Sequence, residues 1–116
     1  MAASSKNHLR LCDLADVTPG TVKRIEVTGF PPLAVYNVDG TYYVTDDTCT
    51  HGGASLADGY LDGDTIECPF HTGRFCIRTG EAVGFPAVVP IRTYTVTIAD
   101  GEILLQSSSE IPGSES

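Results

Sequence analysis

The chain has 116 residues, of which 41% are hydrophobic, and carries 15 Asp and Glu against 7 Lys and Arg, for a formal net charge of −8. A chain of this length forms one hydrophobic core and is too short for two, which excludes a multidomain enzyme. An acidic protein repels phosphate backbones and anionic lipid, so we expect no nucleic acid and no membrane as partner and favour a basic protein surface.

The sequence carries no mark of export or membrane insertion. No apolar run approaches the about 20 residues that span a bilayer, and residues 1–7 lack the apolar stretch of a signal peptide. Four cysteines are also few for a secreted disulfide scaffold. We therefore expect a cytoplasmic protein whose cysteines serve metal or redox chemistry.

Both ends of the chain are poor in apolar residues. We predict a flexible tail over residues 1–7 and a disordered tail over residues 107–116, because neither segment buries enough apolar surface to offset the entropy of ordering. The domain between them, residues 8–106, consists of short β-branched runs cut by turn signals, without apolar residues at helical spacing. The predicted fold is therefore all-β.

Eight segments of this domain are predicted strands. In chain order they are residues 8–12, 21–27, 33–38, 41–45, 65–68, 74–77, 92–98 and 102–106. In residues 92–98 the side chains of Tyr94, Val96 and Ile98 share one face, as in a half-buried antiparallel strand. Short polar turns with glycine at 37–40, 61–64 and 99–101 predict hairpins, and hence a small antiparallel sandwich or barrel.

The segment from about residue 46 to residue 90 differs from the rest of the domain. It is rich in glycine and holds three of the four cysteines and two of the three histidines. Glycine-rich loops of this kind usually carry function on a scaffold that is built elsewhere. We predict that residues 46–90 form a small lobe inserted between strands of the barrel. Asp46 and Asp47, at its start, are interpreted as turn formers.

Two short stretches of this segment each pair a thiol with an imidazole. They are Cys49-Thr50-His51 and Cys68-Pro69-Phe70-His71, with sixteen residues between His51 and Cys68. Two thiolates and two imidazoles suit zinc or an iron-sulfur centre, whereas hard cations such as Ca²⁺ and Mg²⁺ prefer oxygen ligands.

The residues that follow the histidines favour iron-sulfur over zinc. They are small: Gly52, Gly53 and Ala54 after His51, and Thr72 and Gly73 after His71. Small residues let the backbone approach closely, so that N–H groups can donate to the sulfides of a cluster. A structural zinc site normally uses pairs of cysteines two to four residues apart. A zinc domain for protein interaction nevertheless stays as an alternative.

The spacing C-x-H, sixteen residues, C-x2-H resembles the Rieske 2Fe-2S signature. The surrounding CTHGGASLADGYLDGDTIECPFHTGRFCIRTGEAV is similar to the small Rieske ferredoxins of bacterial aromatic-ring dioxygenases, and the similarity extends over residues 11–105. The resemblance implies a Rieske-like β-sandwich or barrel with an inserted cluster-binding lobe and one 2Fe-2S cluster. It implies that Cys49 and Cys68 bind the buried iron and that His51 and His71 bind the outer iron.

The resemblance also implies which residues surround the cluster. The two ligand loops supply Gly52, Gly53, Ala54, Thr72 and Gly73, and Pro86 lies in a segment, residues 83–87, that covers the cluster. Relatives in cytochrome bc complexes have two further cysteines, at the positions of Ala54 and Phe70, and a serine hydroxyl donor at the position of Gly73. Without that donor the sulfurs keep more negative charge, so we expect a potential of about −150 mV, at the low end of the family's range.

The function that the resemblance implies is one-electron transfer. The carrier takes electrons from an NAD(P)H-dependent flavin reductase and passes them to a terminal oxygenase with its own Rieske centre. We expect a monomer that docks through the exposed edges of His51 and His71, with an acidic rim as a further contact. The alternative of a shortened oxygenase needs two more histidines and a carboxylate for its iron, and only His8 remains.

Overall fold

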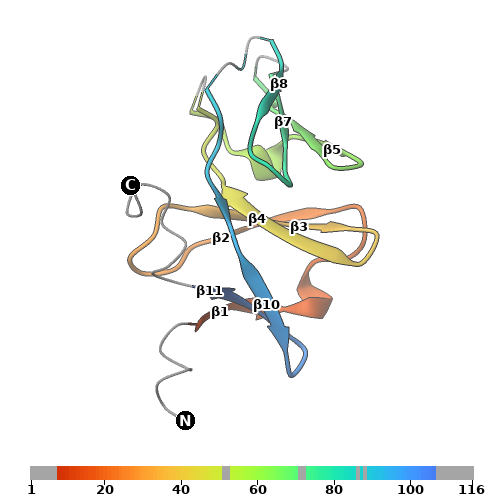
Figure 1. The fold of residues 1–116 in the computed structure, drawn as a ribbon, viewed down its shortest axis with the longest axis vertical. Helices are drawn as coiled ribbons and strands as arrows, with labels where there is room; N and C mark the ends of the chain where they lie inside the picture. Colours follow the sequence, from red (N-terminus) through yellow and green to blue (C-terminus); the bar gives the residue numbers. More distant parts are fainter. Residues whose placement is uncertain (1–7, 51–52, 71–72, 86, 88, 107–116) are drawn as a thin grey trace.

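The structure is a computed structural model in which residues 8–50, 53–70, 73–85, 87 and 89–106 are described. Over these residues it contains three antiparallel sheets and two short 3-10 turns, η1 (Leu14–Asp16) and η2 (Leu56–Asp58) (Figure 1). No helix within the described ranges is long and apolar enough to cross a membrane. The all-β prediction is confirmed, whereas the predicted tails, residues 1–7 and 107–116, lie outside the described residues.

Two sheets form the base of the molecule. The first has the order β1 (His8–Asp13), β11 (Glu102–Gln106), β10 (Val96–Ala99). The second has the order β2 (Val22–Ile25), β3 (Leu33–Val38), β4 (Thr41–Asp46), β9 (Thr93–Tyr94). They enclose one buried cluster, whose members are Leu11, Cys12, Val17, Leu33, Val35, Val44, Tyr94, Ile103 and Leu105.

The third sheet lies at one end of the molecule (Figure 1). Its order is β5 (Tyr60–Asp62), β6 (Thr65–Glu67), β7 (Arg74–Cys76), β8 (Ala82–Gly84). A second buried cluster lies under it, formed by Ala34, Tyr36, Cys49, Ala54, Leu56, Ile66, Cys68, Phe75, Ile77, Ala87 and Ile91.

Strand β3 joins the two buried clusters. Successive side chains of a strand point to opposite faces, so Leu33 and Val35 enter the base cluster while Ala34 and Tyr36 enter the cluster under the third sheet. All four side chains are fully buried, which explains why this strand reads as a continuous apolar run. The cluster under the third sheet is thereby packed directly on the base.

The three predicted hairpins are confirmed. They join β3 to β4, β5 to β6 and β10 to β11. Asp39 and Asp100 take positive φ, each followed by a glycine that also has positive φ, as a two-residue hairpin turn requires.

The prediction of a single strand over residues 92–98 is wrong. The strand is interrupted at Thr95: Tyr94 pairs with Val44 in the second sheet, whereas Val96 pairs with Leu105 in the first. Because the strand changes sheets, it has no continuous buried face, and Ile98 is 46% exposed. Strands β5 and β8 were also not among the predicted strands, because three-residue strands carry too little alternation to be recognised.

Candidate metal centre

Two loops hold the predicted cysteines in equivalent positions. The first follows β4, and the second joins β6 to β7 in the third sheet. The Cys49 N–H donates to the carbonyl of Ala54 at 2.8 Å, and the Cys68 N–H donates to the carbonyl of Gly73 at 2.7 Å. In both cases the cysteine bonds to the residue five positions later, so each cysteine stands at the first position of a closed loop. The spacing of the motif therefore produces two similar loops, each with its cysteine at the base.

Short paired segments support both loops. Thr48 pairs with Ser55 in an isolated bridge before the first loop, and Glu67 pairs with Arg74 at the ends of β6 and β7 before the second. In the first loop Gly53 has a φ of +75°, which favours glycine, and its N–H donates to the Cys49 carbonyl at 3.0 Å. The backbone of the first loop is thus closed by two hydrogen bonds.

The two cysteine side chains are buried in one cluster. Cys49 is 2% exposed and Cys68 is 1% exposed, and both belong to the buried cluster under the third sheet. Cys12 belongs to the base cluster instead, and Cys76 is only partly buried. None of these four described cysteines forms a disulfide. Two buried sulfurs on similar loops fit the thiolate half of a Rieske ligand set.

The imidazole half of the ligand set is not described. His51 and His71 lie outside the described residues, as do Gly52, Thr72 and Pro86 of the predicted surroundings. Within the described ranges no group of three or more His, Cys, Asp or Glu could hold a metal ion.

Ala87 and Val89 connect their segment to the two loops. The Thr50 hydroxyl donates to the Val89 carbonyl at 2.8 Å, which ties this segment to the first loop. Ala87 is buried, and its Cβ would lie 2.9 Å from a Cβ placed on Gly73, which ties the segment to the second loop. Only a residue without a side chain fits at Gly73 unless Ala87 moves. A serine at position 73, as in the cytochrome bc relatives, would therefore meet a steric obstacle that the sequence does not reveal.

Asp46 and Asp47 do not act as simple turn formers. Asp46 ends β4, and its carboxylate accepts a hydrogen bond from the Tyr94 hydroxyl at 2.5 Å. Burial, together with this hydrogen bond, raises the pKa of Tyr94. The Asp47 side chain is 2% exposed, and its carboxylate accepts a hydrogen bond from the Ala57 N–H at 2.9 Å. Asp46 therefore ties the end of β4 to Tyr94 of the base, whereas Asp47 ties the base to the return of the first loop at Ala57.

The exposed surface near the ligand loops is apolar. Phe85 is 85% exposed and Phe70 is 67% exposed, and Val83 and Val89 are each 54% exposed. Phe70 lies within the second loop, between Cys68 and His71, and the other three belong to the segment that contacts both loops. We call these four residues the apolar rim.

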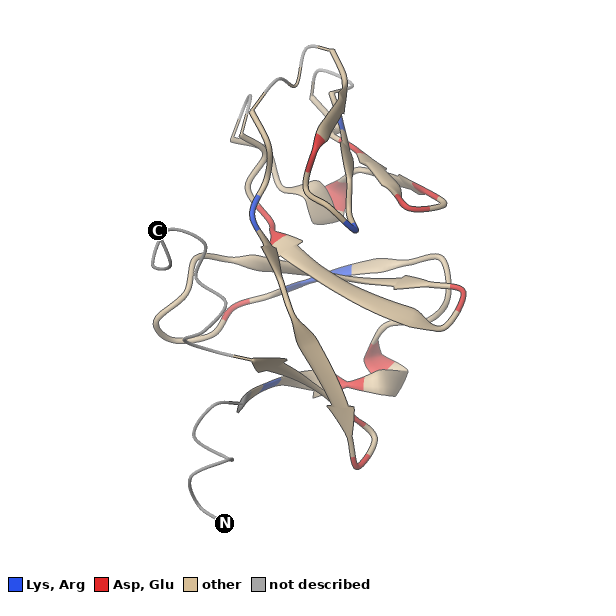
Figure 2. Ribbon diagram, in the orientation of Figure 1, with Lys and Arg blue, Asp and Glu red and all other residues tan. Residues whose placement is uncertain are grey.

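The predicted lobe, residues 46–90, is also strongly acidic. Residues 46–90 hold seven acidic residues and two arginines, and so carry five of the eight net negative charges. Figure 2 shows acidic residues along the β5–β6 hairpin and η2, on the side of the lobe. Four of these acids are in ion pairs: Asp64 with Arg78 at 2.8 Å, Glu67 with Arg74 at 3.4 Å, Asp47 with Arg24 at 3.7 Å and Asp46 with Arg92 at 3.9 Å.

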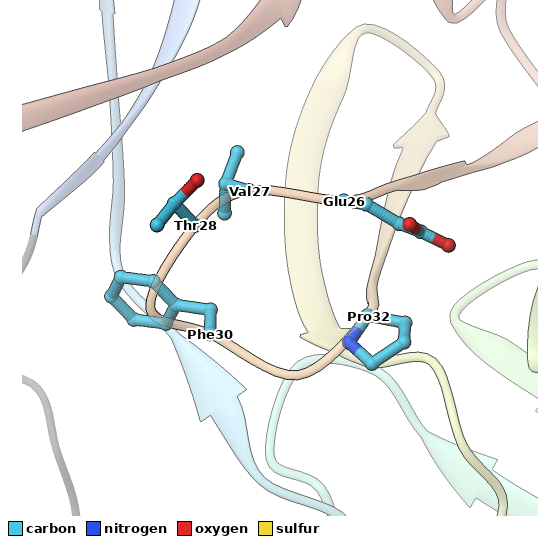
Figure 3. Close-up of a pocket in the computed structure, with 5 residues that line it drawn as sticks. All are labelled: Glu26, Val27, Thr28, Phe30 and Pro32. Atoms are coloured by element: carbon cyan, nitrogen blue, oxygen red, sulfur yellow. The ribbon is translucent and has the colours of Figure 1, made fainter.

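The loop between β2 and β3 forms a pocket of about 390 Å³ (Figure 3). Its lining residues are Glu26, Val27, Thr28, Phe30 and Pro32. This lining contains no thiol or imidazole, and the Glu26 carboxylate pairs with Arg24 at 3.0 Å. The pocket therefore lacks the ligands of the predicted metal centre.

Comparison with known proteins identifies the family. The Rieske 2Fe-2S domain matches residues 7–95. The chain is 48% identical over 95 residues to Ferredoxin CarAc of Metapseudomonas resinovorans, covering 82% of this chain and 89% of the relative.

Solved structures agree with this match. The ferredoxin of Sphingomonas yanoikuyae B1 aligns with a TM-score of 0.85 and 53% identity, covering 88% of this chain and 100% of that one. A ferredoxin chain in a complex of reduced oxygenase and oxidized ferredoxin in carbazole 1,9a-dioxygenase aligns with a TM-score of 0.82 and 45% identity, covering 88% and 94%. The chain therefore belongs to the Rieske 2Fe-2S family, among the ferredoxins that serve as electron-carrying components of dioxygenases.

Proposed function

We propose that Cys49, His51, Cys68 and His71 bind one 2Fe-2S cluster, with the thiolates on the inner iron and the imidazoles on the outer iron. The observation that carries this proposal is the equivalence of the two loops, each with a buried cysteine whose N–H donates to the carbonyl five residues later. When bound, a cluster with this mixed ligation supplies one-electron transfer at a higher potential than four thiolates give.

The remaining loop residues shape the site. Gly52, Gly53, Ala54, Thr72, Gly73 and Pro86 are the residues that we assign to its walls. The close approach of Ala87 to Gly73, and the Thr50 bond to Val89 just beyond the segment, support the role of residues 83–87 as a cover. A cover of this kind excludes water from the buried thiolates, which tunes the potential of the site.

The protein functions by taking electrons from an NAD(P)H-dependent flavin reductase and passing them to a terminal oxygenase with its own Rieske centre. The oxygenase as partner is supported by the solved complex of the carbazole dioxygenase relative. His51 and His71 form the electron port at the docking surface. The exposed apolar rim provides the docking surface with apolar area that a partner can bury.

The acidic side of the lobe steers the approach of a basic partner. The charged residues that we assign to it are Asp58, Asp62, Asp64 and Glu67. Electrostatic steering raises the rate of encounter without the need for a tight complex, which suits a carrier that must leave each partner after transfer. A monomer fits that role because the same surface has to meet two partners in turn.

For this function we propose one Rieske domain over residues 8–106, in which about residues 46–90 form the cluster-binding lobe. Residues 1–7 and 107–116 are tails outside the domain. The proposed compartment is the cytoplasm, in keeping with four cysteines that form no disulfide.

The test is electron paramagnetic resonance of the anaerobically purified, dithionite-reduced protein, with iron, sulfide and zinc measured on the same sample. We expect a rhombic signal with the low average g value of a nitrogen-ligated 2Fe-2S centre and two irons per chain. A silent sample with one zinc and no iron after iron-replete expression would instead support the structural zinc domain.

Paired cysteine variants test the ligand assignment. Cys68→Ser is expected to lose the cluster. The matched control is Cys76→Ser, at the end of β7 and only partly buried, which is expected to keep full iron and sulfide. Equal retention in both variants would contradict the role of Cys68.

A further inference from the structure

Asp47 is a carboxylate almost completely removed from solvent, at 2% exposure, in a chain whose other described acids are all more exposed. A buried charge is costly unless it is compensated by hydrogen bonds or an opposite charge. One carboxylate oxygen accepts the Ala57 N–H at 2.9 Å, and the other lies 3.7 Å from Arg24 Nε. The burial of Asp47 therefore calls for a role beyond solubility.

The first part of that role is to hold the first ligand loop. The Asp47 N–H donates to the Pro32 carbonyl at 2.8 Å on the base, and its carbonyl accepts the Leu56 N–H at 2.7 Å. With the side-chain bond to Ala57, one residue fixes both the entry of the loop at position 47 and its return at positions 56 and 57. Cys49 lies between these two points.

The second part concerns charge. Arg24 compensates the carboxylate only partly, because it is 47% exposed and also pairs with Glu26 at 3.0 Å. Water screens the electric field of the exposed guanidinium more strongly than the field of the buried carboxylate. Asp47 is two residues from Cys49, so their Cα atoms lie within about 7 Å of each other.

We propose that Asp47 is a positioning residue for the first ligand loop whose buried negative charge, moderated by Arg24, holds the reduction potential of the site low. The proposal rests on the proposed function, because it requires the cluster at Cys49. Reduction adds one electron, supplied by the reductase, and therefore one negative charge to the site. A nearby negative charge opposes that addition, and a nearby positive charge favours it.

The neighbouring acid differs in a way that makes the assignment specific to Asp47. Asp46 is 21% exposed, and its carboxylate accepts the Tyr94 hydroxyl and faces Arg92 at 3.9 Å. Its carboxylate thus interacts with Tyr94 and Arg92 on the base and not with the first ligand loop.

Two variants with opposite expected signs test the proposal. Asp47→Asn keeps a side-chain oxygen that can accept the Ala57 N–H while removing the charge, so the potential is expected to rise. Arg24→Gln removes the compensating charge, so the potential is expected to fall. Glu26→Gln is the matched control, because it removes a carboxylate that pairs with the same arginine but is 70% exposed, and its potential is expected to stay at the wild-type value.

The potentials are measured by protein-film voltammetry on samples whose iron, sulfide and paramagnetic signal have been recorded. A loosened loop would shift the reduction potentials of Asp47→Asn and Arg24→Gln in the same direction and would reduce their cluster content. A charge effect shifts the two potentials in opposite directions while the cluster content stays full. Same-sign shifts, or none, in loaded protein would overturn the proposal. A wild-type protein without a cluster would overturn the proposed function instead, so the two failures are distinguishable.

If Asp47→Asn fails to load a cluster, Arg24→Gln decides the electrostatic part. Arg24 is half exposed, so its loss should not prevent folding. An unchanged potential in loaded Arg24→Gln would overturn the proposal on its own.

Discussion

Replacing Gly73 by serine tests how tightly the covering segment packs on the second ligand loop. A Cβ at this position would lie 2.9 Å from the Ala87 Cβ and 3.1 Å from the Ala87 nitrogen. Carbon atoms in contact prefer about 3.5–4.0 Å, so the two segments must separate by about 0.6–1 Å. Ala87 has no flexible side chain that could turn aside, so the backbone itself has to move.

The expected cost follows from two opposing effects. Overpacking of a well-packed core costs about 1–3 kcal/mol, and the loss of glycine entropy in the unfolded chain offsets about 0.4–1 kcal/mol of this. We expect Gly73→Ser to reduce the free energy of unfolding by about 1–2 kcal/mol, which lowers the thermal midpoint by about 4–8 °C.

The assay is thermal unfolding of the loaded protein, followed by circular dichroism at a fixed scan rate. Ala87→Gly removes the opposing Cβ, so the double variant should be more stable than the sum of the two single effects predicts. An unchanged midpoint in Gly73→Ser, or strictly additive effects in the double variant, would refute the steric argument.

The same double variant separates sterics from electronics. If the added hydroxyl donates to a sulfur of the cluster, Gly73→Ser combined with Ala87→Gly should raise the reduction potential relative to Ala87→Gly alone. A potential that stays the same or falls, in protein with full iron content, would count against the hydroxyl-donor explanation of the expected low potential.

Four further predictions follow from the site and its surface. His51→Ala and His71→Ala should each lose iron and acid-labile sulfide, and full retention would contradict their role as ligands. Phe85→Ser should leave the free energy of unfolding within about 0.5 kcal/mol, because Phe85 is 85% exposed, but should slow electron transfer to the oxygenase; an unchanged rate would remove Phe85 from the docking surface. Raising the ionic strength from 0.01 M to 0.15 M shortens the Debye length from about 30 to about 8 Å and should slow reduction by the reductase, whereas indifference to salt would exclude acidic steering. Burial raises the pKa of Tyr94, so the contribution of this residue to stability is complete below pH about 10 and is lost as the pH rises toward the folded-state pKa. Tyr94→Phe should therefore lose less free energy of unfolding than the wild type between neutral and alkaline pH. Equal dependence of the free energy of unfolding on pH in the two proteins would contradict this.

The features that could be predicted from the sequence are those encoded over short distances. The C-x-H and C-x2-H spacing is local, and it predicted the family correctly. The hairpins were predictable because a turn such as Asp100-Gly101 carries its own conformational requirement, and the structure shows positive φ at both residues.

The features that could not be predicted depend on contacts between distant parts of the chain. Periodicity over residues 92–98 gave no sign that Thr95 marks a change of sheet, because that change is set by the partners, β4 and β11. The requirement for glycine at position 73 comes from Ala87, fourteen residues later, and not from the backbone conformation of Gly73 itself. The burial of Asp47 likewise depends on Pro32, Leu56 and Ala57.

The distribution of charge on the lobe suits a carrier that binds briefly. The apolar rim lies on the ligand loops and their covering segment, where a partner has to come close for electron transfer, and a small apolar contact gives little residence time. Asp58 and Asp62, on η2 and β5, are the acids that we propose to act over a longer range. If the acids instead lined the contact itself, each docking event would have to desolvate them, and release would become coupled to their pairing. Separation of steering from contact allows fast encounter and fast release on the same surface.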